Sequence, residues 1–387
     1  MKGHIRQRGP KVFETIVCLG RDASGKWKYN SKTVHGTRKA AEAALSRTLS
    51  ELSLGSFVEP SKTRVPDFLE QQWLPHAKSR TSPRTYERYE QIVKLHLTKA
   101  FAPYTLSGLR PLHIQRALAT WLESGRANGK GGLSPQTVRH HFAVLSEALS
   151  CALRWGLVAR NVCHAVERPR MTVREIKPLD NASLATLFDA VRGSRLEGPV
   201  WLASLTGLRR GEILGLRWSC VNFDEQYLDV KITLQQTGKG NVFFKGPKSA
   251  AGRRRISLPP IAIELLRRQS AMQAADKLKC GPAYQDDGLV FAQPTGLPWK
   301  PETFSRTFTL FLTRHKLQPV SFHSLRHGFA TALARQGVHP RVAQQLLGHS
   351  DPRLTMAVYS HSAPDLERSA VAKVSDALGL AIAAQKR

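Results

Sequence analysis

The stretch Thr206-Gly-Leu-Arg-Arg-Gly-Glu-Ile-Leu-Gly-Leu-Arg-Trp218 is the first of three short blocks that decide how the C-terminal half of the chain is interpreted. The second block is His323-Ser-Leu-Arg-His-Gly-Phe-Ala-Thr331, and the third runs from Leu347-Gly-His to Tyr359. Lys248, in Gly-Pro-Lys-Ser, lies between the first and second blocks. Together they supply two guanidinium groups, two imidazoles, an amine and a phenol. Cleavage of a phosphodiester without a metal ion would require such a set.

The chemistry explains why these residue types are suited to the reaction. A phosphodiester carries one negative charge, and its transition state spreads more charge over the non-bridging oxygens. Arg209 and Arg326 fit a clamp for those oxygens, because a guanidinium is planar, holds two oxygens at once and stays charged. Tyr359 must lose its proton to act as a nucleophile, and holding a phenolate at pH 7 costs about 4 kcal/mol. Nearby cations offset much of that cost, and His323 is a candidate to accept the proton.

The three blocks, in this order, resemble the signature blocks of the tyrosine recombinases, the phage-integrase family. The resemblance covers at least residues 180–362. It implies a metal-independent and ATP-independent enzyme, in which Lys248 gives a proton to the departing 5′ oxygen and His349 hydrogen-bonds a phosphate oxygen. Lys245 is the competing candidate for the lysine. The implied catalytic set is Arg209, Lys248, His323, Arg326, His349 and the nucleophile Tyr359, with Glu212 and His327 in supporting roles.

The composition indicates a nucleic-acid partner. The 387 residues carry 58 Lys and Arg against 29 Asp and Glu, a formal net charge of +29, and the excess is spread over all parts of the chain. A basic surface of this extent is expected to lie along a polyanion. The sequence has no apolar run long enough for a membrane span and no secretion signal. Five scattered cysteines favour reduced thiols in the cytoplasm. No metal-binding or P-loop motif appears, so neither a metal nor another cofactor is expected.

The chain is expected to have several domains. Residues 1–58 predict a small α+β module with strands at Val12–Leu19 and Lys26–Val34 and a helix capped by Thr37. The other predicted parts are an all-α domain at 63–168, an extended linker at 169–178, and a mainly α catalytic domain with a small antiparallel sheet and a C-terminal tail at 179–387. This layout resembles integrases that carry an arm-type DNA-binding domain followed by a helical, SAM-like core-binding domain.

Basic residues outside the blocks are candidates for contacts with DNA phosphates. For several of them, a side chain that is simply exposed to solvent is an equally good interpretation. The candidates are Arg6, Arg8, Lys28, Arg84, Arg139 and Arg253. Within 63–168, Ser82-Pro83 and Ser134-Pro135 predict two helix starts. An apolar stripe at Val138, Phe142, Leu145, Leu149 and Ala152 predicts a helix face that belongs to the core.

The sequence therefore predicts a site-specific DNA recombinase of the integrase type, acting through a 3′-phosphotyrosyl intermediate and a free 5′ hydroxyl. The resemblance further implies a homotetramer that joins two duplexes through a Holliday junction, at core and arm attachment sites of a mobile element such as a prophage. A DNA-bending protein or an excisionase is a possible accessory factor, and the chain is expected on cytoplasmic, nucleoid DNA. The alternatives are a type IB topoisomerase, which reseals the same strand, and a catalytically silent DNA-binding protein of the same fold.

Overall fold

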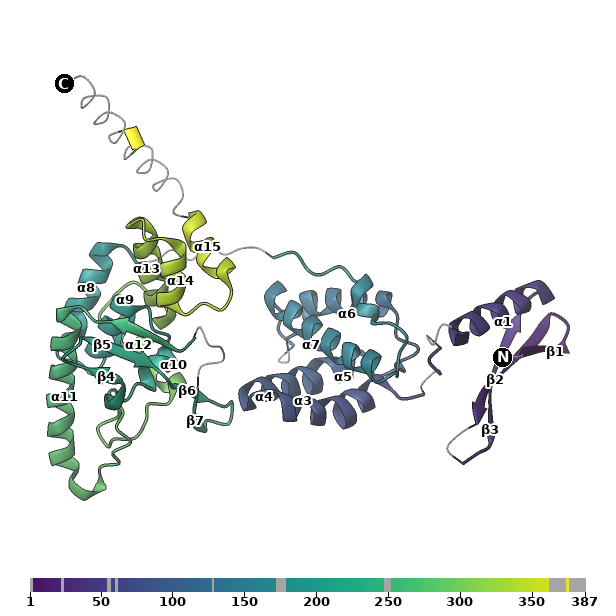
Figure 1. Ribbon diagram of the computed structural model, residues 1–387, viewed down its shortest axis with the longest axis horizontal. Coiled ribbons are helices and arrows are strands. Elements are labelled where there is room, and N and C mark those ends of the chain that lie inside the picture. The colour runs from purple at the N-terminus through teal and green to yellow at the C-terminus, as the bar shows by residue number, and fades with distance from the viewer. Residues whose placement is uncertain are drawn as a thin grey trace. The chain divides into compact units, whose positions relative to one another are not determined.

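The computed structural model describes residues 3–21, 24–53, 57–59, 62–126, 129–171, 179–246, 252–361 and 374–375. The chain divides into two compact units, residues 1–173 and 174–387 (Figure 1). The part of the chain that the structure describes contains no helix long and apolar enough to cross a membrane. Three predicted features lie outside the described residues: Lys248, most of the linker, and nearly all of the tail that follows residue 361.

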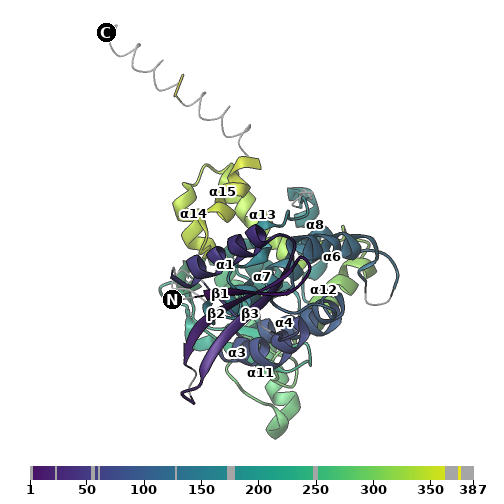
Figure 2. The ribbon, with the colours of Figure 1, turned by 90° about the vertical axis from the view of Figure 1, so that its right-hand side faces the viewer.

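The N-terminal module is an antiparallel sheet in the order β1 (Gly3–Gly9), β2 (Val12–Arg21), β3 (Trp27–His35), with helix α1 (Arg38–Ser53) packed against β1 and β2 (Figure 2). The sequence predicted β2 and β3 but not β1. Alternation along β2 buries Phe13, Thr15 and Val17 on the face that meets the helix. The Thr37 hydroxyl accepts the backbone N–H of Ala40 at 3.3 Å, which confirms the predicted helix cap.

The next part of the chain is entirely helical, apart from one isolated bridge, as predicted. Its elements are α2 (Val65–Asp67), the π-helical turn η1 (Phe68–Trp73), α3 (Leu74–Arg80), α4 (Pro83–Ile92), the π-helical turn η2 (Val93–Leu97), α5 (Thr98–Ala100), α6 (Pro111–Ser124), α7 (Pro135–Arg154) and the 3-10 turn η3 (Val162–Ala165). Ser82 and Ser134 accept the backbone N–H groups of Thr85 and Thr137, so both predicted helix starts are confirmed. The apolar stripe of α7 is fully buried in the core of this part.

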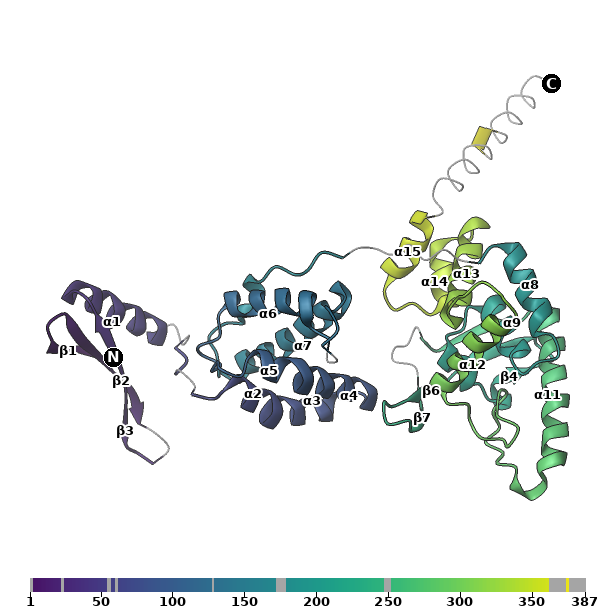
Figure 3. The same cartoon turned by 180° about the vertical axis from the view of Figure 1, so that it is seen from behind.

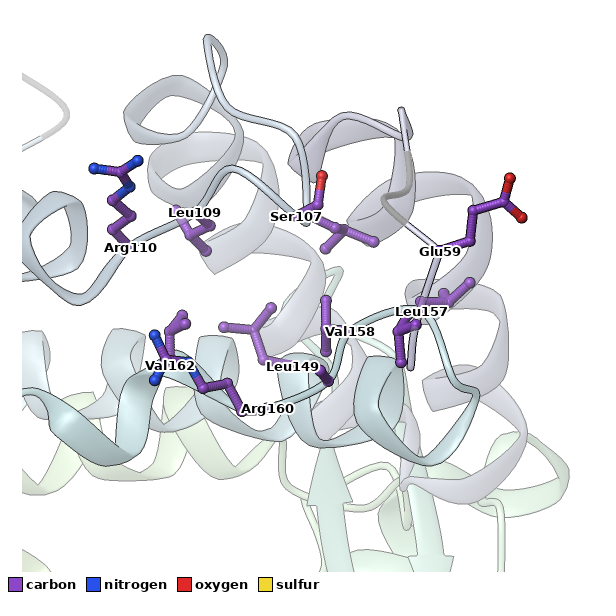
Figure 4. A pocket seen from close by; sticks show the side chains of 12 residues that line it. Glu59, Ser107, Leu109, Arg110, Leu149, Leu157, Val158, Arg160 and Val162 are labelled. Atoms are coloured by element: carbon purple, nitrogen blue, oxygen red, sulfur yellow. The ribbon is translucent and has the colours of Figure 1, made fainter. Parts of the chain in front are cut away.

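The helical part also contains a pocket of about 310 Å³ (Figure 4). Its walls are mainly apolar and include Leu109, Leu149 and Val158. The charged groups of Glu59 and Arg110 point away from these walls. Ser107 and Arg160 are the other polar residues that line it.

The C-terminal unit is mainly helical, as predicted, but it holds two small antiparallel sheets rather than one (Figure 3). The first contains β4 (Val221–Asn222), β5 (Tyr227–Val230) and β8 (Arg254–Ser257), and the second pairs β6 (Thr233–Gln236) with β7 (Val242–Lys245). The helical elements are α8 (Asn181–Val191), α9 (Glu197–Thr206), α10 (Arg210–Leu214), η4 (Trp218–Cys220), α11 (Pro260–Cys280), η6 (Gly281–Ala283), α12 (Pro301–Arg314), α13 (Phe322–Arg335), α14 (Pro340–Leu347) and α15 (Pro352–His361).

Candidate active site

The junction between α9 and α10 places Arg209. Helix α9 ends at Thr206, and Gly207 follows with φ +63°, the left-handed conformation that glycine adopts without strain. A Cβ atom at Gly207 would lie 2.5 Å from Cδ1 of Phe329, so a side chain has no room there. The turn brings Arg209 to the start of α10. The carbonyl of Gly207 accepts Nη1 of Arg326 at 2.6 Å, which joins the first sequence block to the second.

Three arginines meet the C-terminal end of α14, one on each of three successive carbonyl groups. Nε of Arg254 donates to the carbonyl of Leu346 at 2.7 Å, and Nη2 of Arg326 donates to that of Leu347 at 2.7 Å. Nη2 of Arg209 donates to the carbonyl of Gly348 at 2.9 Å. The last carbonyls of a helix lack partners within the helix and carry its partial negative charge, so guanidinium groups suit them well. This end of α14 therefore gathers the two predicted clamp arginines and a third arginine.

Glu212 is the acidic partner of this cluster. Its Oε1 accepts Nη1 of Arg209 at 2.8 Å, and its Oε2 accepts the backbone N–H of Arg209 and Nη2 of Arg254, each at 2.9 Å. Burial alone would raise the pKa of this carboxyl group, because only 4% of the side chain is exposed. The hydrogen bonds and charges of Arg254 and Arg209 outweigh burial and lower the pKa, so Glu212 is ionised at neutral pH.

The cluster has more positive than negative charge. Among the described residues, Arg209 and Arg254 both pair with the carboxylate of Glu212 and Arg326 lies close by, so the three guanidinium groups exceed this carboxylate by two positive charges. Arg326 is only 4% exposed, and burial together with the charge of Arg209 lowers its pKa to about 9. Arg209 has 38% of its side chain exposed, so the cluster is open to an incoming group on that side. An anion that reached Arg209 would relieve the excess charge.

Three histidines surround the arginines, and each has a lowered pKa. His323 and His327 lie on α13 with their rings edge to face, 4.8 Å between centroids. Nδ1 of His349 lies 2.9 Å from the Thr355 hydroxyl. Burial, followed by the charges of Arg326 and other cations, lowers the pKa of His349 to about 4. Reduced hydration also lowers the pKa values of His323 and His327, although part of His323 is open to solvent. The rings are therefore neutral at pH 7, and their lowered pKa values make them weaker bases than a free imidazole.

Tyr359 lies apart from the arginines in this structure. Its side chain is 9% exposed and packs against Ala334 and Ala343, and its hydroxyl donates to the carbonyl of Val338. Ala334 is eight residues beyond Arg326 on α13, which corresponds to about 12 Å along the helix axis. Burial raises the pKa of Tyr359, and among the described residues no cation offsets this effect. The structure thus brings together Arg209, Arg326 and the histidines, but not the predicted nucleophile.

The residues predicted to contact DNA differ in exposure and in their partners. Arg6 and Arg84 are exposed on β1 and α4, Arg139 is partly buried on α7, and Arg253 is exposed just before β8. Arg8 and Lys28 are exposed but form ion pairs with Glu14 and Glu59. Within the described residues, no group of three or more His, Cys, Asp or Glu side chains has the arrangement of a metal site.

Two residues of the site were not predicted from the sequence. Arg254 was not among the predicted site residues, and its side chain is only 6% exposed. Its burial follows the alternation along β8, because Ile256 is buried on the same face, and this signal was available. Thr355, the partner of His349, had no comparable signal. Arg210, next to Arg209, is half-buried and donates to the hydroxyl of Ser305.

Comparison with known families gives two matches. Residues 171–365 match the phage integrase family, and residues 66–122 match the N-terminal SAM-like domain of phage integrases. The first match covers the three blocks and spans half of the chain. The second match falls in the helical part that precedes the linker.

Relatives and solved structures agree with these matches. The chain is 26% identical to a tyrosine recombinase XerC-like protein of Caldanaerobacter subterraneus, over 97% of this chain and 98% of the relative. It is 25% identical to the ICEBs1 integrase of Bacillus subtilis, over 95% and 97%. Its fold is similar to that of the Tn1549 transposon integrase bound to transposon right end DNA, with a TM-score of 0.66 and 19% identity over 81% of this chain and 100% of that one. A lambda integrase tetramer bound to a Holliday junction gives a TM-score of 0.56 at 19% identity, over 92% and 94%.

Proposed function

The chain belongs to the phage integrase family, a family of site-specific DNA recombinases, and we propose that Tyr359 is the nucleophile with which it cuts and rejoins DNA. The Tyr359 hydroxyl oxygen attacks the scissile phosphorus, and the bond from phosphorus to the 5′ oxygen breaks. His323 takes the phenolic proton, and Lys248 gives a proton to the departing 5′ oxygen. The 5′ hydroxyl of a second duplex then attacks the phosphotyrosyl bond. Each step exchanges one phosphoester for another, so no ATP is consumed.

One observation carries this proposal: the arginines on the C-terminal end of α14 form a positively charged site with one open side. Backbone carbonyls hold Arg326 and fix its geometry without neutralising its charge, while Arg209 is held by the Gly348 carbonyl and by the Glu212 carboxylate. Preorganised cations of this kind stabilise charge that develops on phosphate oxygens in the transition state. His349 lies on the same turn and supplies an imidazole at the edge of the site.

The position of Tyr359 requires a movement before cleavage. Its hydroxyl donates a hydrogen bond to the carbonyl of Val338, which follows the C-terminal end of α13. For cleavage, α15 must therefore shift, or a neighbouring subunit must supply its own α15. Near the arginines the phenol would gain the positive field that its present position lacks, and its pKa would fall. We propose that DNA binding and assembly into a tetramer drive this movement.

The test uses a suicide substrate, a duplex of the attachment core with a nick close to the cleavage site. The wild-type chain should form an adduct with DNA that survives SDS, because the short fragment diffuses away and religation is blocked. Tyr359→Phe should form none while still binding the duplex. An adduct that persists in Tyr359→Phe would assign the nucleophile to another residue. Relaxation of supercoils without strand exchange between two sites would instead indicate a topoisomerase.

The N-terminal module is proposed to bind arm-type DNA sites through basic residues such as Arg6, and the helical part to bind core sites through residues such as Arg84. The recombinase would act as a tetramer on nucleoid DNA in the cytoplasm, with an accessory bending protein or excisionase setting the direction. Deletion of residues 1–58 should spare cleavage of core-site DNA and impair integration. Unchanged integration by the deletion variant would remove the arm-binding role.

A further inference from the structure

Arg254 is the first residue of β8, and its guanidinium group connects three segments of the site. Nη2 donates to Oε2 of Glu212 at 2.9 Å, and Nη1 lies 3.3 Å from Oε1 of the same carboxylate. Nε donates to the carbonyl of Leu346 at 2.7 Å, and Nη1 also reaches the carbonyl of Gly252 at 3.3 Å. The side chain is 6% exposed. One buried group thus holds the carboxylate beside Arg209, the end of α14 and the start of its own strand.

We propose that Arg254 is a positioning residue for strand cleavage, which fixes Glu212 and the end of α14 so that Arg209 stays aimed at the scissile phosphate. The inference rests on the proposed function, because it assigns Arg209 to the phosphate. Arg254 does not touch DNA itself: its donors are engaged by Glu212 and by carbonyls, and its side chain is almost fully buried. Arg209, with 38% of its side chain exposed, is the arginine that meets the anion.

The hydrogen bonds show how the alignment works. Oε1 of Glu212 accepts Nη1 of Arg209, while Oε2 is held by Nη2 of Arg254 and by the backbone N–H of Arg209. Without Arg254 the carboxylate loses this competing partner and is free to turn both oxygens toward the Arg209 guanidinium. A bidentate carboxylate would then occupy the fork that a phosphate requires. The net charge of the cluster would also fall from two positive charges to one.

The end of α14 depends on Arg254 in the same way. The Leu346 carbonyl that Arg254 holds directly precedes the carbonyls of Leu347 and Gly348, which hold Arg326 and Arg209. His349 is the next residue. Loss of the first of these three hydrogen bonds would loosen a turn to which both clamp arginines are fastened. Arg254 therefore acts on the site through both the carboxylate and the backbone.

A substitution of Arg254 also removes a buried ion pair, so a readout is needed that loss of stability alone would not change. The experiment measures single-turnover cleavage by the full-length chain of two nicked attachment-core duplexes. One carries the ordinary scissile phosphate. The other carries a methylphosphonate at that position, whose reacting group is neutral. A defect in the arginine clamp affects the charged substrate far more than the neutral one, whereas a general loss of folded protein slows both equally.

We expect Arg254→Gln to slow cleavage of the phosphate substrate by about 100-fold, the size of effect seen when a preorganised transition-state contact is lost. Cleavage of the methylphosphonate should slow by only a few-fold. Arg254→Lys keeps the positive charge but loses the planar guanidinium with its several donors. We therefore expect this variant to fold and to cleave the phosphate substrate about tenfold more slowly, with a much smaller effect on the methylphosphonate. Arg255→Gln is the matched control, because Arg255 is 56% exposed on the opposite face of β8 and pairs with Asp229. It should leave the ratio of the two rates unchanged.

Two results would overturn the inference. Cleavage of the phosphate substrate at the wild-type rate by Arg254→Gln and Arg254→Lys would show that the residue positions nothing. An equal slowing on both substrates, in both variants, would show that Arg254 serves only the stability of the fold. Failure of the proposed function is recognised separately, because the wild-type chain would then form no covalent adduct with the phosphate substrate.

Discussion

Replacement of Glu212 by glutamine should destabilise the C-terminal unit strongly. The carboxylate is 4% exposed and is the only anion recorded against Arg209 and Arg254 in the described part of the site. An amide carries no negative charge. Its NH2 group is a hydrogen-bond donor, so it cannot accept the guanidinium N–H groups that the carboxylate oxygen accepted. Removal of one partner from a buried ion pair typically costs about 3–5 kcal/mol, because the other charge stays buried without compensation.

The measurement is hydrogen exchange of the full-length chain in increasing urea, followed in peptides from α9, α10 and β8. We expect Glu212→Gln to lower the free energy of opening of these peptides by about 3–5 kcal/mol. Asp229→Asn is the matched control, an acid-to-amide change in the same unit. Asp229 accepts from Arg255 at 3.1 Å and from Lys231 at 3.2 Å, but both basic side chains are more than half exposed. A surface pair of this kind contributes at most about 1 kcal/mol.

Equal losses in the two variants would refute the reasoning, because they would show that Glu212 is not the counter-ion of a buried cluster. The pH dependence of stability gives an independent check that ionised Glu212 stabilises the folded chain. The pKa of Glu212 is lowered in the folded chain, so its contribution to stability is present above the unfolded-state pKa and is lost as the pH falls through the folded-state value. Glu212→Gln should therefore lose less stability on acidification than the wild-type chain does.

Three further outcomes are expected. Tyr359→Phe should lower the free energy of unfolding by only about 1 kcal/mol, since it removes one hydrogen bond to a backbone carbonyl; a thermal shift several times larger would contradict this. Gly207→Ala should lower the free energy of unfolding in urea by more than about 2 kcal/mol, because the new Cβ clashes with Phe329 and the backbone has a positive φ. Gly240→Ala is the control: its φ is +87° but the space around it is open, so the loss should be about 1 kcal/mol. Burial first, then nearby cations, lowers the pKa values of His141 and His349 to about 4. Because unfolded histidine titrates near 6.5, stability should fall between pH 6.5 and 4, and His141→Leu should flatten that fall in the helical part.

The sequence blocks predicted which residue types meet at the site, and the catalytic roles of these residues stay a prediction. Arg209, Arg326 and His349 occur in short blocks with a fixed order, and the fold brings them to one turn. The helical part was also predictable, because Ser82 and Ser134 are local caps and the stripe along α7 repeats at helical spacing. These signals are local in sequence, so they can be read without knowing the tertiary structure.

The features that were missed depend on contacts between distant segments. Strand β1 is short and mostly polar, and it forms only because β2 offers a paired edge. The hydrogen bonds to the end of α14 use backbone carbonyls, which leave no pattern in the side chains. Arg254 lies in a run of three arginines that looks solvated, although alternation with Ile256 marks it as buried. The location of Tyr359 depends on how α15 packs, and its sequence block is compatible with either location.

The way the arginines are held explains how a buried site keeps its affinity for an anion. A guanidinium can be fixed either by carboxylates or by carbonyls. A carboxylate neutralises charge, and at Arg209 a phosphate has to share the guanidinium with Glu212. A carbonyl is a neutral dipole, so it orients the Arg326 guanidinium at the Gly207 and Leu347 oxygens and leaves its full charge for the transition state. The cost appears in the lowered pKa of Arg326, which shows that its charged form is strained by burial. In the proposed reaction, a phosphate beside Arg209 would offset the repulsion between the Arg209 and Arg326 guanidinium groups, at the point where charge accumulates during cleavage.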